Sequence, residues 1–240
     1  MNTDNRRATS VLTAQPPAPL AESSERPLGT VTLTLGVLVG VVCLGFVIGR
    51  FAGPAVHTKM WPWVVGRGIG IAAYIALSAL TAAGLWTRHP LRQRSGLGNP
   101  ATWLHVHAAL GAAALVLTVT HVVVLALDKY AGVGWVGVFV PGRATYRPLA
   151  VALGSIGLYV ALIVGGTAAL AGYLFRRSWR PLHYFALLSF ASICAHGVLA
   201  GSDATALRPI YIATGLFVGL LALSRWAIPS GLAAPAPAAR

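Results

Sequence analysis

Two histidines on one apolar stretch have the spacing to act together inside a membrane. His107 and His121 are 14 residues apart within residues 102–127, a stretch without a charged side chain. At about 100° per residue, this spacing falls about 40° short of four helical turns, so both imidazoles leave the same face. At about 1.5 Å per residue they lie about 21 Å apart along the helix axis. Each imidazole is therefore expected near one membrane surface, where it can bind a metal ion.

A second apolar stretch, residues 181–201, carries His183 and His196 at a spacing of 13. On an ideal helix this spacing falls about 140° short of four turns, so the two imidazoles would leave different faces. A tilted helix, or irregular winding of the first turn after Pro181, is needed to bring both rings to one side.

Four imidazoles arranged as two pairs at matching depths can hold two haem irons, each between one histidine from each helix. If both stretches cross the membrane in the same direction, His107 pairs with His183 and His121 with His196. Covalent attachment is not expected, because the sequence has no CxxCH motif. We therefore predict two b-type haems with these four histidines as iron ligands.

Composition indicates what kind of protein positions these residues. Of the 240 residues, 56% are hydrophobic and 10% are charged, and the mean hydropathy is +0.72, which is typical of a membrane protein. We predict an all-α polytopic membrane protein, in which six transmembrane helices form a haem-binding bundle in contact with lipid. The six apolar spans are residues 29–50, 62–86, 102–127, 148–175, 181–201 and 208–228.

The polar ends and the basic loops define the expected topology. Residues 1–27 are expected to be a disordered cytoplasmic tail, residues 28–228 the six-helix domain, and residues 229–240 a short cytoplasmic tail. Most of the 18 basic residues lie in the tails and in the second and fourth loops, so the positive-inside rule places both termini in the cytoplasm. The protein is then a multi-pass protein of the plasma membrane. This topology and the lipid headgroups explain the net charge of +13, and no nucleic-acid partner is expected.

One arginine, the three remaining histidines and one loop have expected roles of their own. Arg67 lies about 9 Å inside the second span, and two interpretations stay open: it snorkels to the surface, or it binds a propionate of the outer haem. His105 is two residues from His107 and points about 200° away from it, which favours a packing role. His57 and His89 lie in loops and are expected to be solvated. The unusually apolar outer loop 128–147 is expected to cover the outer haem.

Over about residues 60–228, the sequence resembles the ferric reductase-like transmembrane domain. The resemblance rests on the two histidine spacings, on Trp-Arg-Pro-Leu-His-Tyr at 179–184, and on Gly-Arg-Gly-Ile-Gly-Ile-Ala at 66–72 with Gly84 downstream. Ferric reductases, NADPH oxidases and the haem subunit of a bacterial periplasmic methionine sulfoxide reductase system share this domain. The resemblance implies that the four histidines ligate two b-type haems, which pass electrons across the membrane.

Only residues 229–240 follow the last predicted span, so we expect no flavin and nicotinamide domain like that of the larger family members. The protein is then an oxidoreductase that takes electrons from a quinol or a separate reductase, with flavin or quinone supplied by that partner. It reduces an external acceptor such as ferric iron or a periplasmic protein. One alternative is a cytochrome b subunit of a larger quinone-linked complex. Another is a transporter with histidine proton relays, which is disfavoured because all five acidic residues lie in tails or loops.

Overall fold

The computed structural model describes residues 59–95, 99–170, 179–201 and 204–228, together with five single positions, 34, 37, 38, 41 and 42. These residues contain helices and turns and no strand. Five of the helices are long and apolar enough to cross a membrane. The described chain is therefore a helical, membrane-embedded bundle, as its composition predicts. The predicted span 29–50 lies largely outside the described residues, and the two predicted tails lie entirely outside them.

The long helices coincide with five of the predicted spans. Their bounds are α3 (Trp61–Thr87), α5 (Pro100–Leu127), α7 (Pro148–Ala169), α9 (Ala186–Ala200) and α10 (Ala204–Ala227). Three short helices lie between them: α4 (Pro90–Ser95), α6 (Gly134–Phe139) and α8 (Trp179–His183). α8 and α9 together form one span. α10 begins earlier than predicted, so Pro209 lies inside the helix rather than near its start.

Prolines and one capping residue set where three of the helices begin. Pro62, Pro100 and Pro148 occupy the first or second position of α3, α5 and α7. A missing N–H does no harm there, because the first turn of a helix has no intrahelical acceptor for it. Ahead of α5, the Asn99 side chain accepts a hydrogen bond from the backbone N–H of Ala101 at 2.9 Å. This N-cap satisfies one of the free N–H groups at the start of the helix.

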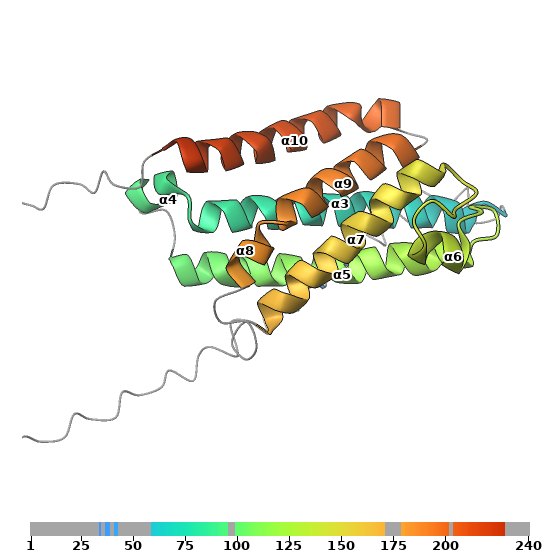
Figure 1. Cartoon of the computed structure of the whole chain (residues 1–240), viewed down its shortest axis with the longest axis horizontal. Coiled ribbons are helices and arrows are strands. Elements are labelled where there is room, and N and C mark those ends of the chain that lie inside the picture. The colour runs from blue at the N-terminus through green and yellow to red at the C-terminus, as the bar shows by residue number, and fades with distance from the viewer. Residues whose placement is uncertain are drawn as a thin grey trace, which may run out of the picture.

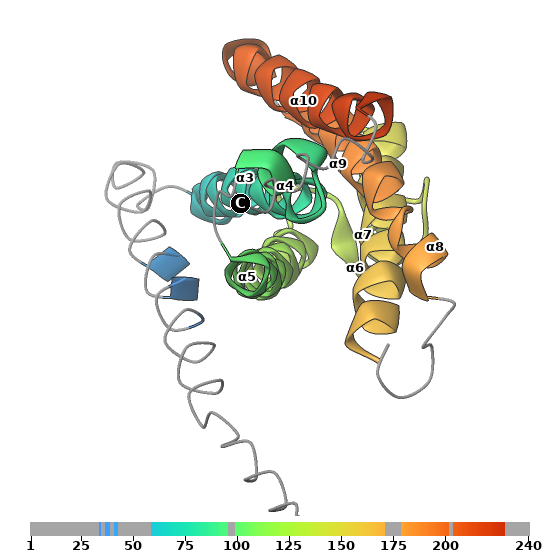
Figure 2. The same ribbon diagram turned by 90° about the vertical axis from the view of Figure 1, so that its left-hand side faces the viewer.

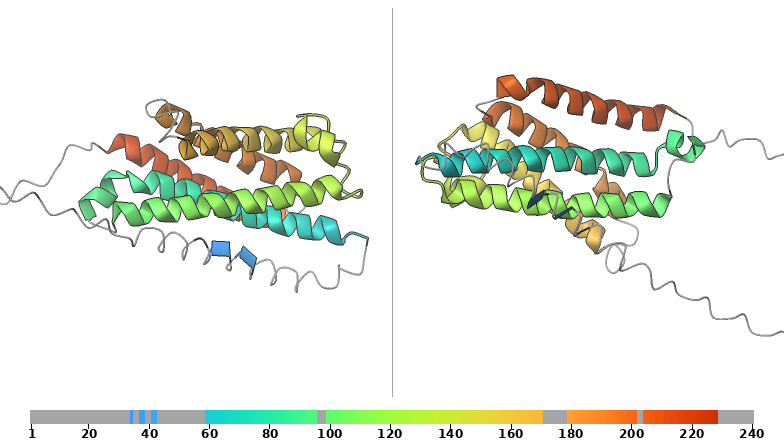
Figure 3. Two further views of the ribbon diagram at one scale, coloured as in Figure 1. Left: turned by 90° about the horizontal axis from the view of Figure 1, so that it is seen from below. Right: turned by 180° about the vertical axis from the view of Figure 1, so that it is seen from behind.

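The helices pack as two pairs, with α10 beside them. α3 packs against α5 and α7 against α9, while α10 contacts α3 and α9 (Figure 2). The short helices α4 and α6 lie at opposite ends of the bundle (Figures 1 and 3). α5 and α9 both run toward the end at which α6 lies (Figure 1). Their histidines can therefore meet at two levels.

Small residues let the helices of each pair approach closely. A Cβ at Gly66 would lie 2.9 Å from Leu125 Cδ2, and a Cβ at Gly157 would lie 2.6 Å from Ile193 Cγ1. The buried residues of α3 and α5 include several more small side chains, at Ala72, Ala73, Ala83, Ala109, Ala113 and Ala114. Large side chains on α10 are exposed, among them Leu216, Phe217, Leu220 and Leu223. Close packing through small residues, with large apolar side chains turned outward, is typical of helices in lipid.

Candidate functional site

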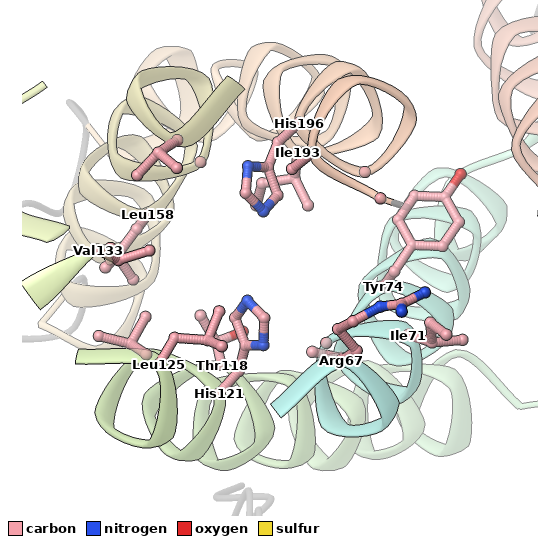
Figure 4. Close-up of a pocket in the computed structure, with 18 of the residues that line it drawn as sticks. Arg67, Ile71, Tyr74, Thr118, His121, Leu125, Val133, Leu158, Ile193 and His196 are labelled. Carbon is pink, nitrogen blue, oxygen red and sulfur yellow. The ribbon is translucent and has the colours of Figure 1, made fainter. Parts of the chain in front are cut away.

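His121 on α5 and His196 on α9 face each other across a cavity inside the bundle (Figure 4). Their ring centroids are 6.5 Å apart, and the ring planes are 77° from parallel. The Nδ1 atom of His121 lies 2.7 Å from the carbonyl oxygen of Gly66, and that of His196 lies 2.7 Å from the carbonyl oxygen of Ala150. A carbonyl only accepts, so each Nδ1 donates and carries the proton. Each ring therefore keeps Nε2 as its electron-pair donor, the arrangement found in metal-binding histidines.

A second pair lies nearer the α4 end of the bundle. The rings of His107 on α5 and His183 on α8 have centroids 6.0 Å apart and planes 67° from parallel. The Nδ1 atom of His107 lies 3.0 Å from the carbonyl oxygen of Leu80. The Nδ1 atom of His183 is buried and has no hydrogen-bond partner among the described residues. The structure thus brings together the two histidine pairs that the sequence predicted, with one ring held less firmly than the other three.

An interruption between α8 and α9 helps to bring both rings to one side at a spacing of 13. The helix stops after His183, and the chain turns at Tyr184 and Phe185 before α9 begins. Their N–H groups bond to carbonyls three residues back, Tyr184 to Pro181 at 3.2 Å and Phe185 to Leu182 at 3.1 Å. Bonds of this i to i+3 type wind the chain more tightly than an α-helix does. Each residue wound in this way adds about 20° of rotation, so the turn supplies part of the angle of about 140° that an ideal helix would lack.

Three of the imidazoles lie directly against glycines. A Cβ at Gly70 would lie 2.7 Å from His121 Cε1, one at Gly84 would lie 2.9 Å from His107 Cε1, and one at Gly154 would lie 2.8 Å from His196 Nδ1. Any larger residue at these positions would displace the ring. Sequence reasoning missed this role, although a signal was present: Gly70 and Gly84 on α3 are 14 residues apart, like the two histidines of α5.

The cavity around His121 and His196 is large and mainly apolar. Its empty space is about 1290 Å³, which includes the part open at its mouth. Val133, Val138 and Tyr146 from the loop between α5 and α7 line one end of it. The predicted outer loop 128–147 therefore does lie over this site.

Arg67 is among the residues that line the same cavity (Figure 4). Its guanidinium carbon lies 6.0 Å from the ring centroid of Trp63, a cation–π distance. A cation in an otherwise apolar lining can attract an anionic group of a ligand. The position fits the predicted role at a haem propionate, which remains a prediction.

The remaining histidines have different surroundings. His105 is partly buried on α5, and its packing role stays a prediction. His57 lies outside the described residues. The prediction that His89 is solvated is wrong, because its side chain is completely buried. The chain folds back after α3, so that His89 stacks on Trp86 at 5.5 Å and its Nε2 lies 3.0 Å from Ser224 Oγ on α10.

Two imidazoles bound to opposite sides of one metal ion have a characteristic separation. With a metal–nitrogen bond of about 2.0 Å and about 1.1 Å from nitrogen to the ring centre, the centroids lie about 6.2 Å apart. The observed separations of 6.0 Å and 6.5 Å lie on either side of that value.

No family model, curated protein or solved structure matches this chain. The chemical interpretation therefore depends on the positions of these residues and on the sequence resemblance.

Proposed function

We propose that the chain is a membrane-embedded di-haem b cytochrome that transfers electrons across the membrane to an external acceptor, in the manner of ferric reductases. The observation that carries this proposal is the pair of facing imidazoles at each of two levels, close enough in each pair to hold one metal ion between them. The sequence resemblance to the ferric reductase-like domain, which rests in part on the spacing of the same four histidines, supports the same function.

The chain's own residues would hold and orient the two cofactors. His107 and His183 would ligate one haem, and His121 and His196 the other. Hydrogen bonds from Nδ1 to backbone carbonyls fix three of these rings in the tautomer that leaves Nε2 free. Bound haem supplies a reversible one-electron change at its iron. The apolar cavity lining would keep water from the iron, and Arg67 would bind a propionate.

The two sites would connect the two faces of the membrane. The histidines on α5 are 14 residues apart, or about 21 Å along the helix. The α4 end carries Arg88, Arg92 and Arg94 and is assigned to the cytoplasm by the positive-inside rule. A quinol or a separate reductase would deliver electrons there, with flavin or quinone belonging to that partner. The α6 end would face the external acceptor.

A pyridine haemochrome assay on protein purified from membranes tests the proposal directly. We expect about two haems per chain with a b-type spectrum, because each pair of histidines would hold one haem. Metal analysis of the same sample is the control, since imidazole pairs also bind zinc and copper. Protein that carries one of those metals in place of haem, or a haem stoichiometry near zero, would show that the proposed function is wrong.

A further inference from the structure

Two consecutive residues before α7 hold the C-terminal end of α9. The Nη1 atom of Arg147 donates to the carbonyl oxygens of Leu199 at 2.6 Å and of Gly201 at 3.5 Å. The hydroxyl of Tyr146 donates to the carbonyl oxygen of Ala200 at 2.9 Å. The last carbonyls of a helix have no intrahelical N–H partner, and a cation near them is favourable because of the helix dipole. We name this contact between residues 146–147 and residues 199–201 the α9 clamp.

The backbone of Arg147 is unusual for a residue other than glycine. Its φ of 38° and ψ of 66° lie in the left-handed region, and among the described residues no other non-glycine has a positive φ. This conformation is disfavoured for an L-residue with a side chain, and glycine would adopt it more readily. An arginine at this position therefore indicates that its side chain has a function, here the bonds to the end of α9.

The α9 clamp lies one helical turn from the hydrogen bond that orients His196. Ala150, in the first turn of α7, accepts the Nδ1–H of His196 at 2.7 Å. Arg147 precedes Ala150 by three residues, and Leu199 follows His196 by three. The start of α7 and the end of α9 are thus joined at two neighbouring levels, by the Arg147 side chain and by the His196 ring. A shift of one helix end along the other would break both contacts together.

We propose that Arg147 and Tyr146 are positioning residues for His196, an inference that rests on the proposed function as far as the haem is concerned. By fixing the end of α9 against the first turn of α7, the clamp keeps the Ala150 carbonyl within reach of His196 Nδ1. It thereby sets the orientation of this imidazole in the His121/His196 site. Tyr146 also lines the cavity and packs edge-on against Trp63, with centroids 5.1 Å apart, so the clamp also fixes one end of the cavity.

Three variants separate the parts of the clamp. Tyr146→Phe removes only the hydroxyl and keeps the ring packing, whereas Arg147→Gly removes the guanidinium and relieves the backbone. Arg147→Lys keeps the positive charge and should therefore retain part of the clamp, so its haem potential and spectrum should change less than those of Arg147→Gly. Arg143→Gln is the matched control, because Arg143 is an exposed arginine of the same loop.

The readouts are redox titration, electron paramagnetic resonance of the two low-spin haems, and amide hydrogen exchange across α7 and α9. In Tyr146→Phe and Arg147→Gly we expect a changed potential and spectrum for one haem only, the one lost in His196→Leu. Loss of a hydrogen bond that orients a metal-binding imidazole lowers metal affinity about 10–100-fold, so this haem should dissociate about tenfold faster. Exchange at residues 197–201 should also be about tenfold faster, because the clamp contacts are lost.

The outcomes distinguish this inference from the proposed function. If the wild type binds two haems and neither variant alters the potential or the spectrum of either one, the positioning role is wrong. If the wild type binds no haem, the proposed function is wrong. Amide hydrogen exchange alone then tests whether the clamp positions His196. Faster exchange at both 147–151 and 196–201 would then support the coupling of the clamp to His196, and unchanged exchange would refute it. Should Arg147→Gly not fold, Tyr146→Phe gives the same test.

Discussion

Gly70 lies so close to His121 that a Cβ at Gly70 would come within 2.7 Å of the imidazole Cε1. Gly84 stands in the same relation to His107, at 2.9 Å. The two glycines of α3 and the two histidines of α5 share a spacing of 14 residues. Because α3 and α5 are antiparallel, one glycine lies against one imidazole at each of the two levels. The absence of a side chain at each glycine leaves the space in which the ring lies.

Alanine at either glycine should weaken cofactor binding at one level only. Gly70→Ala is expected to affect the His121/His196 site and Gly84→Ala the His107/His183 site. Overpacking of this kind costs about 1–3 kcal/mol, which corresponds to about a 5–150-fold loss of affinity. Haem content and redox titration after purification give the measurement. Gly111→Ala is the control, since a Cβ there would meet Leu80 at an ordinary 3.7 Å. If Gly111→Ala loses as much haem as Gly70→Ala and Gly84→Ala, the explanation by contact between the glycines and the imidazoles is wrong.

The four histidine variants should fall into two groups. His107→Leu and His183→Leu are expected to lose one haem, and His121→Leu and His196→Leu the other, because the rings meet in these pairs. Redox titration of each single variant should reveal which spectral component is missing. His105→Leu should keep both haems, because His105 is two residues from His107 and points about 200° away from it. Any grouping of His107 with His196 would be incompatible with the arrangement of α5, α8 and α9.

Much of this architecture could be predicted from the sequence, because lipid imposes simple rules on it. Apolar stretches of about 20 residues must be helical to satisfy their backbone groups, so five spans could be predicted, although α7 ends at Ala169, earlier than the predicted residue 175. The pairing of the histidines followed from their depth along the helices. Depth depends only on the number of residues, and a small change in winding hardly alters it.

Features that depend on local winding or on tertiary contact could not be predicted. The spacing of His183 and His196 did not reveal the turn at Tyr184 and Phe185, because nothing in their side chains requires one. The sequence predicts a solvated His89 because it follows Arg88, yet the fold buries it against Ser224 of α10. The role of Arg147 arises from a contact with residues more than 50 positions away in the sequence. Such a contact leaves no periodic pattern.

Burial of His89 makes a prediction about stability and pH. Desolvation, and secondly the charge of Arg225, lower the pKa of His89 below its usual 6.5. Its Nδ1 accepts the N–H of Leu91 at 3.2 Å, a bond that only the neutral ring can make. The unfolded chain takes up this proton more readily than the folded protein. The folded state should therefore lose stability as the pH falls below about 6.5, and the effect should be absent at higher pH.

Thermal unfolding of the purified protein at about pH 5.5 and about pH 7.5 tests whether stability falls at the lower pH. His89→Gln should cost about 1–3 kcal/mol at the higher pH, because buried hydrogen bonds to Ser224 and Leu91 are lost. The cost should shrink at the lower pH, where the wild type is also weakened. If wild type and variant show the same pH dependence, His89 is not responsible for it.

The two sites should differ in how firmly they hold a cofactor. Both rings of the His121/His196 site donate Nδ1–H to a carbonyl at 2.7 Å, whereas in the other site His183 Nδ1 has no partner among the described residues. A ring without this bond is less well oriented and less basic, which typically costs about 10–100-fold in metal affinity. Apomyoglobin, a strong haem acceptor, should therefore extract the His107/His183 haem first. The order can be followed by redox titration, and the reverse order would show that this hydrogen bond does not control retention.

Transfer of electrons between the two faces can be measured in proteoliposomes with the protein in one orientation. A reductant confined to the α4 side should reduce an impermeant ferric chelate on the α6 side, since the two histidine pairs lie about 21 Å apart along α5. His121→Leu should abolish this transfer, because the loss of one of two successive sites leaves a gap too long for rapid electron transfer. The His107/His183 haem should still become reduced in that variant, and His105→Leu should keep the wild-type rate. Transfer at the wild-type rate without His121 would mean that electrons do not pass through these two sites.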